Sequence, residues 1–352
     1  GFAGQAVVPS MVERELDRLF AFRHRRLQTD LDRHAAHAGK PRLTVAITGS
    51  SGLIGSNLRH FLTTGGHRVL RVVRRRGESG PDTVHWSPGT GEIDRDALAQ
   101  ADAVVHLAGE PIAPGRWSDE RKRAILDSRV KSTELLARTL AELQDGPRTL
   151  ISSSAVGFYG NSGDARIEEG GENGKGFLAE VCRAWELATR PAEKAGLRVV
   201  RLRTGVVLSP AGGALAELLT PFKMGAGGRL GSGDQYMSWI DLDDVVGLVG
   251  HLLYDERARG PVNATAPHPV TNATFASTLG RVLGRPTLIP VPAFAVKAAF
   301  GQMGQETLLW GQRVLPAKAQ ELGYRFAYEG LEDSLRFQLG HDEGGPSAEV
   351  EG

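Results

Sequence analysis

A glycine-rich turn between an apolar run and a helical pattern has the clearest chemistry in this sequence. Residues 43–48 read as a short buried strand, and Gly49, Gly52 and Gly55 follow at regular spacing. Gly49 permits a tight turn, Gly52 lets the backbone approach a phosphate, and Gly55 lets the next helix lie close to the sheet. That helix N-terminus adds free N–H donors and partial positive charge. We therefore expect a dinucleotide to bind at this turn, against Gly49, Gly52 and Gly55.

The end of the second predicted strand, residues 68–73, indicates which dinucleotide binds. An NAD-specific site places an acidic residue there to bind the ribose 2′-hydroxyl, but here Val73 is followed by three arginines. A guanidinium can neutralise a 2′-phosphate and donate two hydrogen bonds to it. The pattern favours NADP over NAD, with Arg74, nearest the strand end, as the best candidate to bind the 2′-phosphate. The alternative is a solvated arginine turn that is compatible with NAD.

The strand predicted at Ala103 to Leu107 should end beside the same ligand. In a doubly wound parallel sheet the ligand crosses the carboxyl ends of the strands. Leu107, Ala108 and Gly109 should therefore lie along the cofactor, whereas His106 is interpreted as a packed strand residue.

Strands and helices alternate from residue 43 onward, which predicts the α/β class with a Rossmann-type doubly wound parallel sheet. We expect a Rossmann domain over residues 41–265, a smaller C-terminal α/β substrate lobe over 266–340, and a disordered tail over 341–352. Residues 206–235 are rich in glycine and show no regular period, so they are expected to form loops over the site.

Residues 1–40 differ in character from the rest. Ser10 and Glu13 form a capping box, and an apolar stripe then recurs at helical spacing on Val12, Leu16, Leu19, Leu27 and Leu31. We expect an amphipathic helix that docks by this stripe on its own protein, the alternative being a separate partner or a preceding module. The chain begins with Gly rather than Met, which suggests a fragment of a longer protein.

The overall composition excludes several classes of function. Forty-two basic and 41 acidic side chains give a net charge of +1, so nothing favours nucleic acid or an anionic membrane as partner. Cys182 is the single cysteine, which favours a reducing, cytoplasmic location, and no cysteine–histidine cluster predicts a metal site. No apolar run approaches the roughly 20 residues of a membrane span.

Four stretches together resemble the extended short-chain dehydrogenase/reductases: residues 48–55, 102–109, the serine-rich 151–160, and the strand-to-helix junction 238–245. Over residues 43–340 the chain is similar, more narrowly, to nucleoside-diphosphate-sugar epimerase-like proteins with a small extra C-terminal domain. The helix before residue 40 lies outside this match and resembles the last helix of a module that precedes the domain in longer relatives. The resemblance implies that further residues face the cofactor, with Val207 near the nicotinamide: Ser50, Ser51, Leu53, Ile54, Val73 and Arg129. The alternative for Arg129 is a surface salt bridge.

The sequence departs from that superfamily at the residues that move protons. The Tyr-x-x-x-Lys pair is absent, because aligning Trp185-Glu186 with the usual acid of that helix places Leu178 and Cys182 at the two positions. The resemblance leaves Ser154, the strand-end serine, as a candidate catalytic residue. Tyr159 is the nearest phenol that could replace the missing acid, unless it is a buried ring with a satisfied hydroxyl. Glu110, Arg116 and Trp117 would line the same mouth, and Glu180 would face the site or solvent.

Two functions follow from these expectations. The first is an NADP-dependent oxidoreductase or epimerase-like enzyme that acts on a hydroxyl or carbonyl of a small polar molecule, for which a nucleotide-linked sugar is one candidate. Hydride chemistry belongs to the nicotinamide, so activity could survive the loss of Tyr and Lys. The second is an NADPH-binding regulatory or scaffold protein that has lost its catalytic pair.

Overall fold

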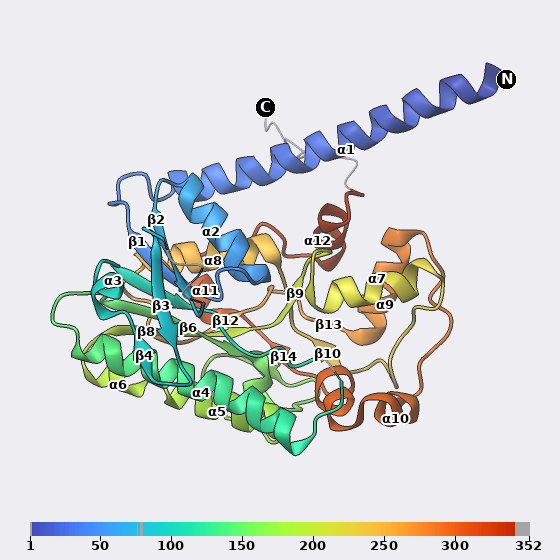
Figure 1. The fold of residues 1–352 in the computed structure, drawn as a ribbon. Coiled ribbons are helices and arrows are strands. Elements are labelled where there is room, and N and C mark those ends of the chain that lie inside the picture. The colour runs from blue at the N-terminus through green and yellow to red at the C-terminus, as the bar shows by residue number, and fades with distance from the viewer. Residues whose placement is uncertain (1, 76, 78–79, 114, 342–352) are drawn as a thin grey trace.

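A largely parallel sheet forms the centre of the protein (Figure 1). The computed structural model describes residues 2–75, 77, 80–113 and 115–341. Eight of the described strands form this sheet in the order β12-β8-β6-β5-β1-β2-β3-β4, with only β3–β4 antiparallel. Their bounds are β1 (Thr44–Thr48), β2 (Arg68–Val73), β3 (Thr83–Ser87), β4 (Glu92–Ile93), β5 (Ala103–His106), β6 (Thr149–Ala155), β8 (Arg198–Thr204) and β12 (Gly260–Ala264). The doubly wound Rossmann-type sheet expected from the sequence is confirmed.

Helices cover both faces of the sheet (Figure 1). On one face lie α2 (Leu53–Thr64) and α8 (Leu242–Tyr254), and on the other α4 (Asp119–Glu142), α5 (Phe177–Leu187) and α6 (Arg190–Lys194). Each interface is an apolar core: Leu58, Leu62 and Leu248 are among the side chains of the first, and Leu136 and Leu140 belong to the second. The sequence showed neither β4 nor the short helix α3 (Arg95–Ala99), because elements of two and five residues carry too little periodicity.

A third apolar core belongs to the smaller lobe. It is built by α7 (Gly213–Lys223), α9 (Asn272–Leu283) and α12 (Leu331–Gln338), packed against β9 (Val206–Leu208) and β11 (Trp239–Asp241). The expectation of loops over residues 206–235 is therefore wrong for β9 and α7. Leu215 and Phe222 give α7 a buried side despite Pro221 within the helix and a glycine at each end of the segment.

Short elements complete the smaller lobe and its junction with the sheet. Two-stranded ladders join β7 (Arg166–Ile167) to β14 (Arg313–Val314) and β10 (Tyr236–Met237) to β13 (Val270–Thr271). The remaining helical segments are η2 (Val156–Tyr159), α10 (Ala293–Gly304), η3 (Gln305–Leu309) and α11 (Ala317–Glu321). The tail expected after residue 341 lies outside the described residues.

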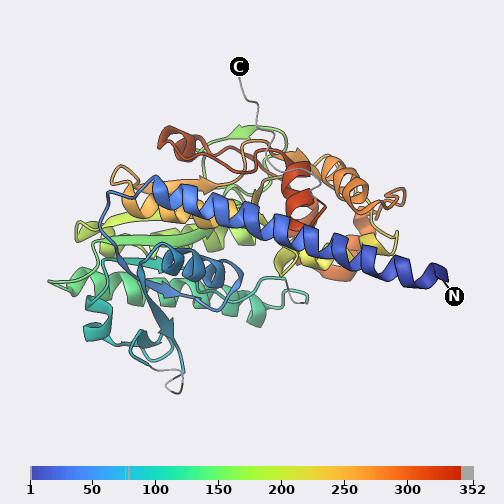
Figure 2. The ribbon, with the colours of Figure 1, turned by 90° about the horizontal axis from the view of Figure 1, so that it is seen from above.

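The long helix α1 (Phe2–Ala35) crosses over α2 and α8 and extends past the body of the protein (Figures 1 and 2). It does dock on its own protein, but not by the expected face. The apolar stripe is exposed, at 51% for Val12, 46% for Leu16, 49% for Leu19, 52% for Leu27 and 48% for Leu31. The docked face carries Phe22, Arg26 and Arg33 instead, because its counterpart on α8 is acidic. No helix in the described part of the chain combines the length and apolarity that crossing a bilayer requires.

Candidate functional site

The glycine turn connects β1 to α2 at the carboxyl end of the sheet. Gly49 has φ +67°, a conformation that side chains other than glycine rarely adopt, and a Cβ there would lie 3.0 Å from Ala108 N. A Cβ at Gly55 would lie 2.2 Å from Gly49 O, so this glycine lets α2 pack against the turn itself. Gly52 precedes the first residue of α2, and no side chain caps that helix. The N-terminal N–H groups of α2 are therefore available to an anion.

A buried polar network fixes the neighbouring strand end. Thr48 Oγ1 accepts hydrogen bonds from the N–H groups of Leu107 (3.0 Å) and Ala108 (3.1 Å), and it lies 2.7 Å from Nδ1 of His106. The other ring nitrogen of His106 lies 2.9 Å from Thr133 Oγ1. Burial lowers the pKa of His106 to about 4, so the ring is neutral. His106 is thus a packed strand residue that also orients the segment expected to follow the cofactor.

An exposed cation, Arg74, lies at the end of β2. Val73 is buried, whereas Arg74 is exposed and makes no side-chain hydrogen bond or ion pair with the described residues. Its main-chain oxygen lies 3.2 Å from Nε2 of His85, which fixes the backbone from which the guanidinium extends. The side chain is free to meet a phosphate.

Arg129 reaches the end of β5 from α4. A Cβ at Gly109 would lie 3.4 Å from Arg129 Cζ, and the guanidinium lies 5.0 Å from the ring centre of Trp185. Arg129 donates to the Ile125 carbonyl at 3.0 Å, so the described contacts do not make it the surface salt bridge considered above. Burial lowers the pKa of Arg129, although an arginine remains charged at neutral pH. The buried indole N–H of Trp185 has no acceptor among the described residues.

Val207 packs against the same apolar core as Leu53, Ile54 and Leu107. It is half-buried in β9 and pairs with Ile240 of β11, the strand that leads directly into α8. The glycine turn, Arg74, the end of β5, Arg129 and Val207 come from separate parts of the chain. Each belongs to an element that ends at, or packs against, the carboxyl edge of the sheet.

The positions of the missing Tyr-Lys pair lie on α5 and carry no proton-transfer group. Leu178 is half-buried, and burial raises the pKa of the Cys182 thiol to about 11, so it is a neutral packed group. The carboxylate of Glu306 caps this helix, accepting from the N–H of Phe177 at 3.0 Å and that of Leu178 at 2.9 Å. Neither side chain at these positions can exchange a proton with substrate near neutral pH.

Both candidate hydroxyls, Ser154 and Tyr159, lie in a buried polar network. Ser154 Oγ donates to Glu186 at 2.8 Å, and Arg203 binds both oxygens of that carboxylate at 2.7 and 2.9 Å. The Tyr159 hydroxyl accepts from Arg203 at 2.9 Å and donates to Asn263 at 2.7 Å. Ser154 and Tyr159 are each 3% exposed, and burial raises the pKa of Tyr159. The arrangement is that of a satisfied interior phenol, the alternative raised for Tyr159 from the sequence.

The other residues assigned to the mouth have different partners. Glu110 pairs with Arg121 at 2.8 Å, and Arg116 binds the carbonyls of Ala298 and Ala299 on α10. Trp117 is buried, with its ring 5.0 Å from that of Phe177. Glu180 is exposed on α5. No group of three or more His, Cys, Asp or Glu side chains in the described ranges is placed to hold a metal ion.

Sequence reasoning missed the residues that organise this region: Thr48, Glu186, Arg203, Asn263 and Glu306. A signal existed for one of them, because Arg203 interrupts the apolar run of a central strand, and a buried charge requires a partner. Its partner Glu186 was used only to align this helix with the corresponding helix of the superfamily. The other pairings join residues far apart in the chain, and the sequence offered no sign of them.

The geometry defines a class of protein: a Rossmann-type α/β protein with a glycine turn at its sheet edge and a smaller C-terminal lobe. The model of the NAD dependent epimerase/dehydratase family matches residues 45–264, and a domain of unknown function, DUF1731, matches residues 291–338. The chain therefore belongs to the NAD dependent epimerase/dehydratase family, within the extended short-chain dehydrogenase/reductases, and has the expected extra C-terminal domain.

Relatives cover most of the chain. Epimerase family protein Mb2239 of Mycobacterium bovis is 48% identical over 293 residues, which are 83% of this chain and 96% of the relative. The structure of a Corynebacterium glutamicum nucleoside-diphosphate sugar epimerase has a TM-score of 0.78 and 39% identity, and covers 92% of this chain. The match spans 65% of that longer chain. The structure of human SDR39U1 (isoform 2) with NADPH has a TM-score of 0.75 and 34% identity, covering 83% of this chain and 98% of its own.

Proposed function

We propose that the protein is an NADP-dependent oxidoreductase or epimerase-like enzyme acting on a hydroxyl or carbonyl of a small polar substrate. Arg74 carries the proposal, because it is an exposed guanidinium at the end of β2, where an NAD-specific protein has a carboxylate. The NADPH in the human SDR39U1 structure supports the phosphorylated nucleotide. The corynebacterial relative's description as a nucleoside-diphosphate sugar epimerase supports a nucleotide-linked sugar as the substrate.

The described residues fit this cofactor. The uncapped start of α2 would take the pyrophosphate, Arg74 the 2′-phosphate, and Leu107, Ala108 and Gly109 the ribose side, with Val207 nearer the nicotinamide. Arg129 would donate to the ribose or phosphates, and the indole N–H of Trp185 is a second unused donor beside it. When bound, the nicotinamide supplies hydride transfer.

The chain's own residues would bind and orient the two reactants. The buried ion pair of Arg203 and Glu186 holds the Ser154 hydroxyl against the Glu186 carboxylate. In this arrangement Ser154 helps to fix the end of its strand. Ser154 remains the candidate to bind a substrate oxygen, which requires its hydroxyl to turn away from Glu186. Tyr159 would have to leave both Arg203 and Asn263 to move a proton.

These buried hydroxyls also favour the second function, an NADPH-binding regulatory or scaffold protein. With Leu178 and Cys182 at the Tyr and Lys positions, and with Ser154 and Tyr159 bonded inside the protein, none of these four side chains is free to act as an acid. The two functions share the nucleotide site and differ in turnover. We favour the enzyme because the cofactor can carry out the redox step itself.

Substitution at Arg74 tests the nucleotide choice. Because a hydrogen bond to a charged group is worth about 1.5–3 kcal/mol, Arg74→Gln should weaken NADPH binding roughly 10- to 100-fold and leave NADH binding unchanged. Arg68→Gln, at the opposite end of the same strand, is the matched control. Fluorescence titration with both nucleotides gives the answer, and equal losses for NADPH and NADH would contradict the assignment.

Turnover separates the enzyme from the scaffold. NADPH oxidation should depend on a carbonyl substrate from a panel that includes nucleotide-linked keto-sugars, and Ser154→Ala should lower kcat. Tyr159→Phe should lower stability while leaving kcat per folded molecule unchanged, since its hydroxyl serves Arg203 and Asn263. Binding of NADPH without oxidation across the whole panel would support the scaffold instead.

A further inference from the structure

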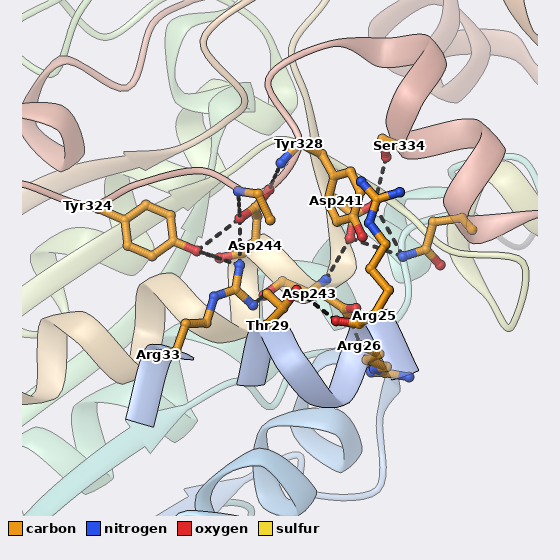
Figure 3. Close-up of polar contacts among 12 residues, drawn as sticks. Arg25, Arg26, Thr29, Arg33, Asp241, Asp243, Asp244, Tyr324, Tyr328 and Ser334 are labelled. Carbon is orange, nitrogen blue, oxygen red and sulfur yellow. Dashed lines mark hydrogen bonds and ion pairs between the residues drawn. The ribbon is translucent and has the colours of Figure 1, made fainter. Parts of the chain in front are cut away.

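Three carboxylates are buried in the first turn of α8, as Figure 3 shows. Asp241, Asp243 and Asp244 are 0%, 4% and 0% exposed. Asp241 caps the helix through the N–H of Asp243 at 2.8 Å, and it also accepts from Ser334 at 2.6 Å and Gln338 at 3.0 Å on α12. A helix N-terminus favours negative charge, but burying several carboxylates together is costly unless cations accompany them.

Two cations that accompany them come from α1 (Figure 3). Arg26 pairs with Asp243 at 2.9 Å, and Arg33 pairs with Asp244 at 2.7 Å while donating to the Asp243 carbonyl at 2.7 Å. Arg33 also lies 3.2 Å from the hydroxyl of Tyr324. A separate helix thus supplies charge compensation to a core element of the Rossmann domain.

Asp244 connects this cluster to the C-terminal part of the chain. Its carboxylate accepts from the N–H groups of Ala327 (2.9 Å) and Tyr328 (3.0 Å), and from the Tyr324 hydroxyl (3.0 Å). The segment from Tyr324 to Tyr328 leads into α12, which packs in the core of the smaller lobe. Asp244 therefore ties α8 to that lobe, and Arg33 lies over the junction.

The remaining contacts of α1 also reach both parts of the protein. Arg26 donates to Asn57 of α2 at 2.6 Å, and the ring of Phe22 stacks on that of Phe337 of α12 at 4.7 Å. Arg25 lies 5.1 Å from the ring centre of Tyr328. A cavity of about 950 Å³ runs along the helix between these contacts. The attachment therefore depends on a few anchors and not on continuous packing.

The family's model begins to match at residue 45, so α1 lies outside it. The match of 293 residues covers 96% of the mycobacterial relative, so roughly a dozen of its residues fall outside the match. That number is too small for a 34-residue helix. In this chain helix α1 neutralises carboxylates that belong to the domain.

We propose that α1 is an electrostatic clamp: Arg26 and Arg33 are positioning residues that hold the start of α8 against the Tyr324–Tyr328 segment and so fix the smaller lobe on the Rossmann domain. Since α8 continues from β11, which pairs with the strand that carries Val207, the clamp also holds one side of the candidate site. The proposal does not depend on which nucleotide or substrate binds there.

Hydrogen exchange of the full chain without nucleotide tests the clamp. Arg33→Met should lower protection at least tenfold in α8 and residues 324–338 at pH 7.5. Arg23→Met, on the exposed side of the same helix, should stay within twofold of the unchanged protein. Arg33→Lys should recover part of the protection because it keeps the charge. Equal protection in the Arg33→Met and Arg23→Met proteins would overturn the proposal.

The pH profile separates charge from packing. The charged and titratable groups around the cluster are Arg25, Arg26, Asp30 and Arg33 on α1, the three aspartates at the start of α8, and Tyr324 and Tyr328. Burial raises the pKa of Asp244 and the guanidinium of Arg33 opposes that rise, so Arg33→Met lets Asp244 take up a proton more readily. The loss of protection should therefore be smaller at pH 5.5 than at pH 7.5.

The double variant Arg33→Met/Asp244→Asn provides a second test that does not require the single variant to be well folded. Removing the carboxylate together with its partner leaves no unpaired charge, so its protection should exceed that of Arg33→Met. An Arg33→Met defect that is the same at both pH values, or a double variant worse than the single one, would show that α1 acts by packing alone.

Discussion

Arg203 illustrates how single residues organise the candidate site. Its guanidinium is buried in a central strand, binds Glu186 through two hydrogen bonds, and lies 3.5 Å from the ring centre of Phe158. Both hydroxyls that the sequence suggested for proton transfer belong to this network. An ion pair in the sheet therefore sets the orientation of Ser154 and Tyr159.

Removing one partner of the Arg203–Glu186 pair should strongly lower the free energy of unfolding. Glu186→Gln leaves the Arg203 charge buried and uncompensated, which typically costs about 3–5 kcal/mol of unfolding free energy. Urea denaturation measures this loss of unfolding free energy. Glu193→Gln, which breaks the exposed pair with Arg201, should cost under about 1 kcal/mol. The double variant Glu186→Met/Arg203→Met should lose less unfolding free energy than the single variants Glu186→Met and Arg203→Met lose together. Losses that simply add would argue against a coupled pair.

The sequence predicted residues whose requirement is local and missed those whose partners are distant. Gly49 and Gly55 were identifiable because backbone crowding within a few residues demands glycine. Ser154 lies 32 residues from Glu186, and Tyr159 lies 104 residues from Asn263. Strand pairing and helix packing create those contacts, so the motif showed the two hydroxyls but not what occupies them.

Elements were predictable where their pattern was long and regular. The strands at 44–48, 68–73 and 103–106 agree with the expectations within one residue. Helix α7 was missed because glycines flank it and a proline lies within it. The face by which α1 docks was misjudged for a physical reason: an apolar stripe usually packs, but here the complementary surface consists of carboxylates.

The junction of turn and helix gives a prediction at the scale of an element. Helix propensity alone makes Gly55→Ala stabilising by up to about 1 kcal/mol. A Cβ there would lie 2.2 Å from Gly49 O, so we expect instead a loss of about 1–3 kcal/mol and weaker NADPH binding as the turn shifts. Thermal unfolding and nucleotide titration measure both effects. Gly89→Ala, with nothing within 4 Å, is the control, and a stabilised Gly55→Ala protein would contradict the close packing.

The whole molecule combines a central sheet covered by helices, a smaller lobe with its own core, and the helix α1. The alternation of strands and helices correctly indicated an α/β fold, and the net charge follows from composition because it is a simple sum. The arrangement of charge was not accessible in that way. Acidic residues gather at one turn of α8 and basic residues on one face of α1, and only the fold brings them together.

Titration of the interior gives a prediction for the whole molecule. Burial lowers the pKa of His106 from 6.5 to about 4, so the folded state binds this proton less readily than the unfolded chain. The resulting stability is present above pH 6.5 and is lost as the pH falls toward 4, by about 3 kcal/mol in total. The carboxylate of Asp30 has the opposite sign: burial raises its pKa to about 6, and its protonation stabilises the fold below that pH.

A difference measurement isolates the histidine from such opposing groups. His106→Asn should lower the unfolding free energy at pH 7.5, because the contacts to Thr48 and Thr133 weaken. The gap between this variant and the unchanged protein should then shrink steadily as urea denaturation is repeated from pH 7.5 to 4.5, since only the unchanged protein loses the His106 contribution. His60→Asn, at an exposed histidine, should run parallel to the unchanged protein over the whole range. A gap that stays constant for His106→Asn would mean that this ring takes up its proton as readily in the folded state as in the unfolded chain. A neutral imidazole would then not explain how the strand end beside the glycine turn is held.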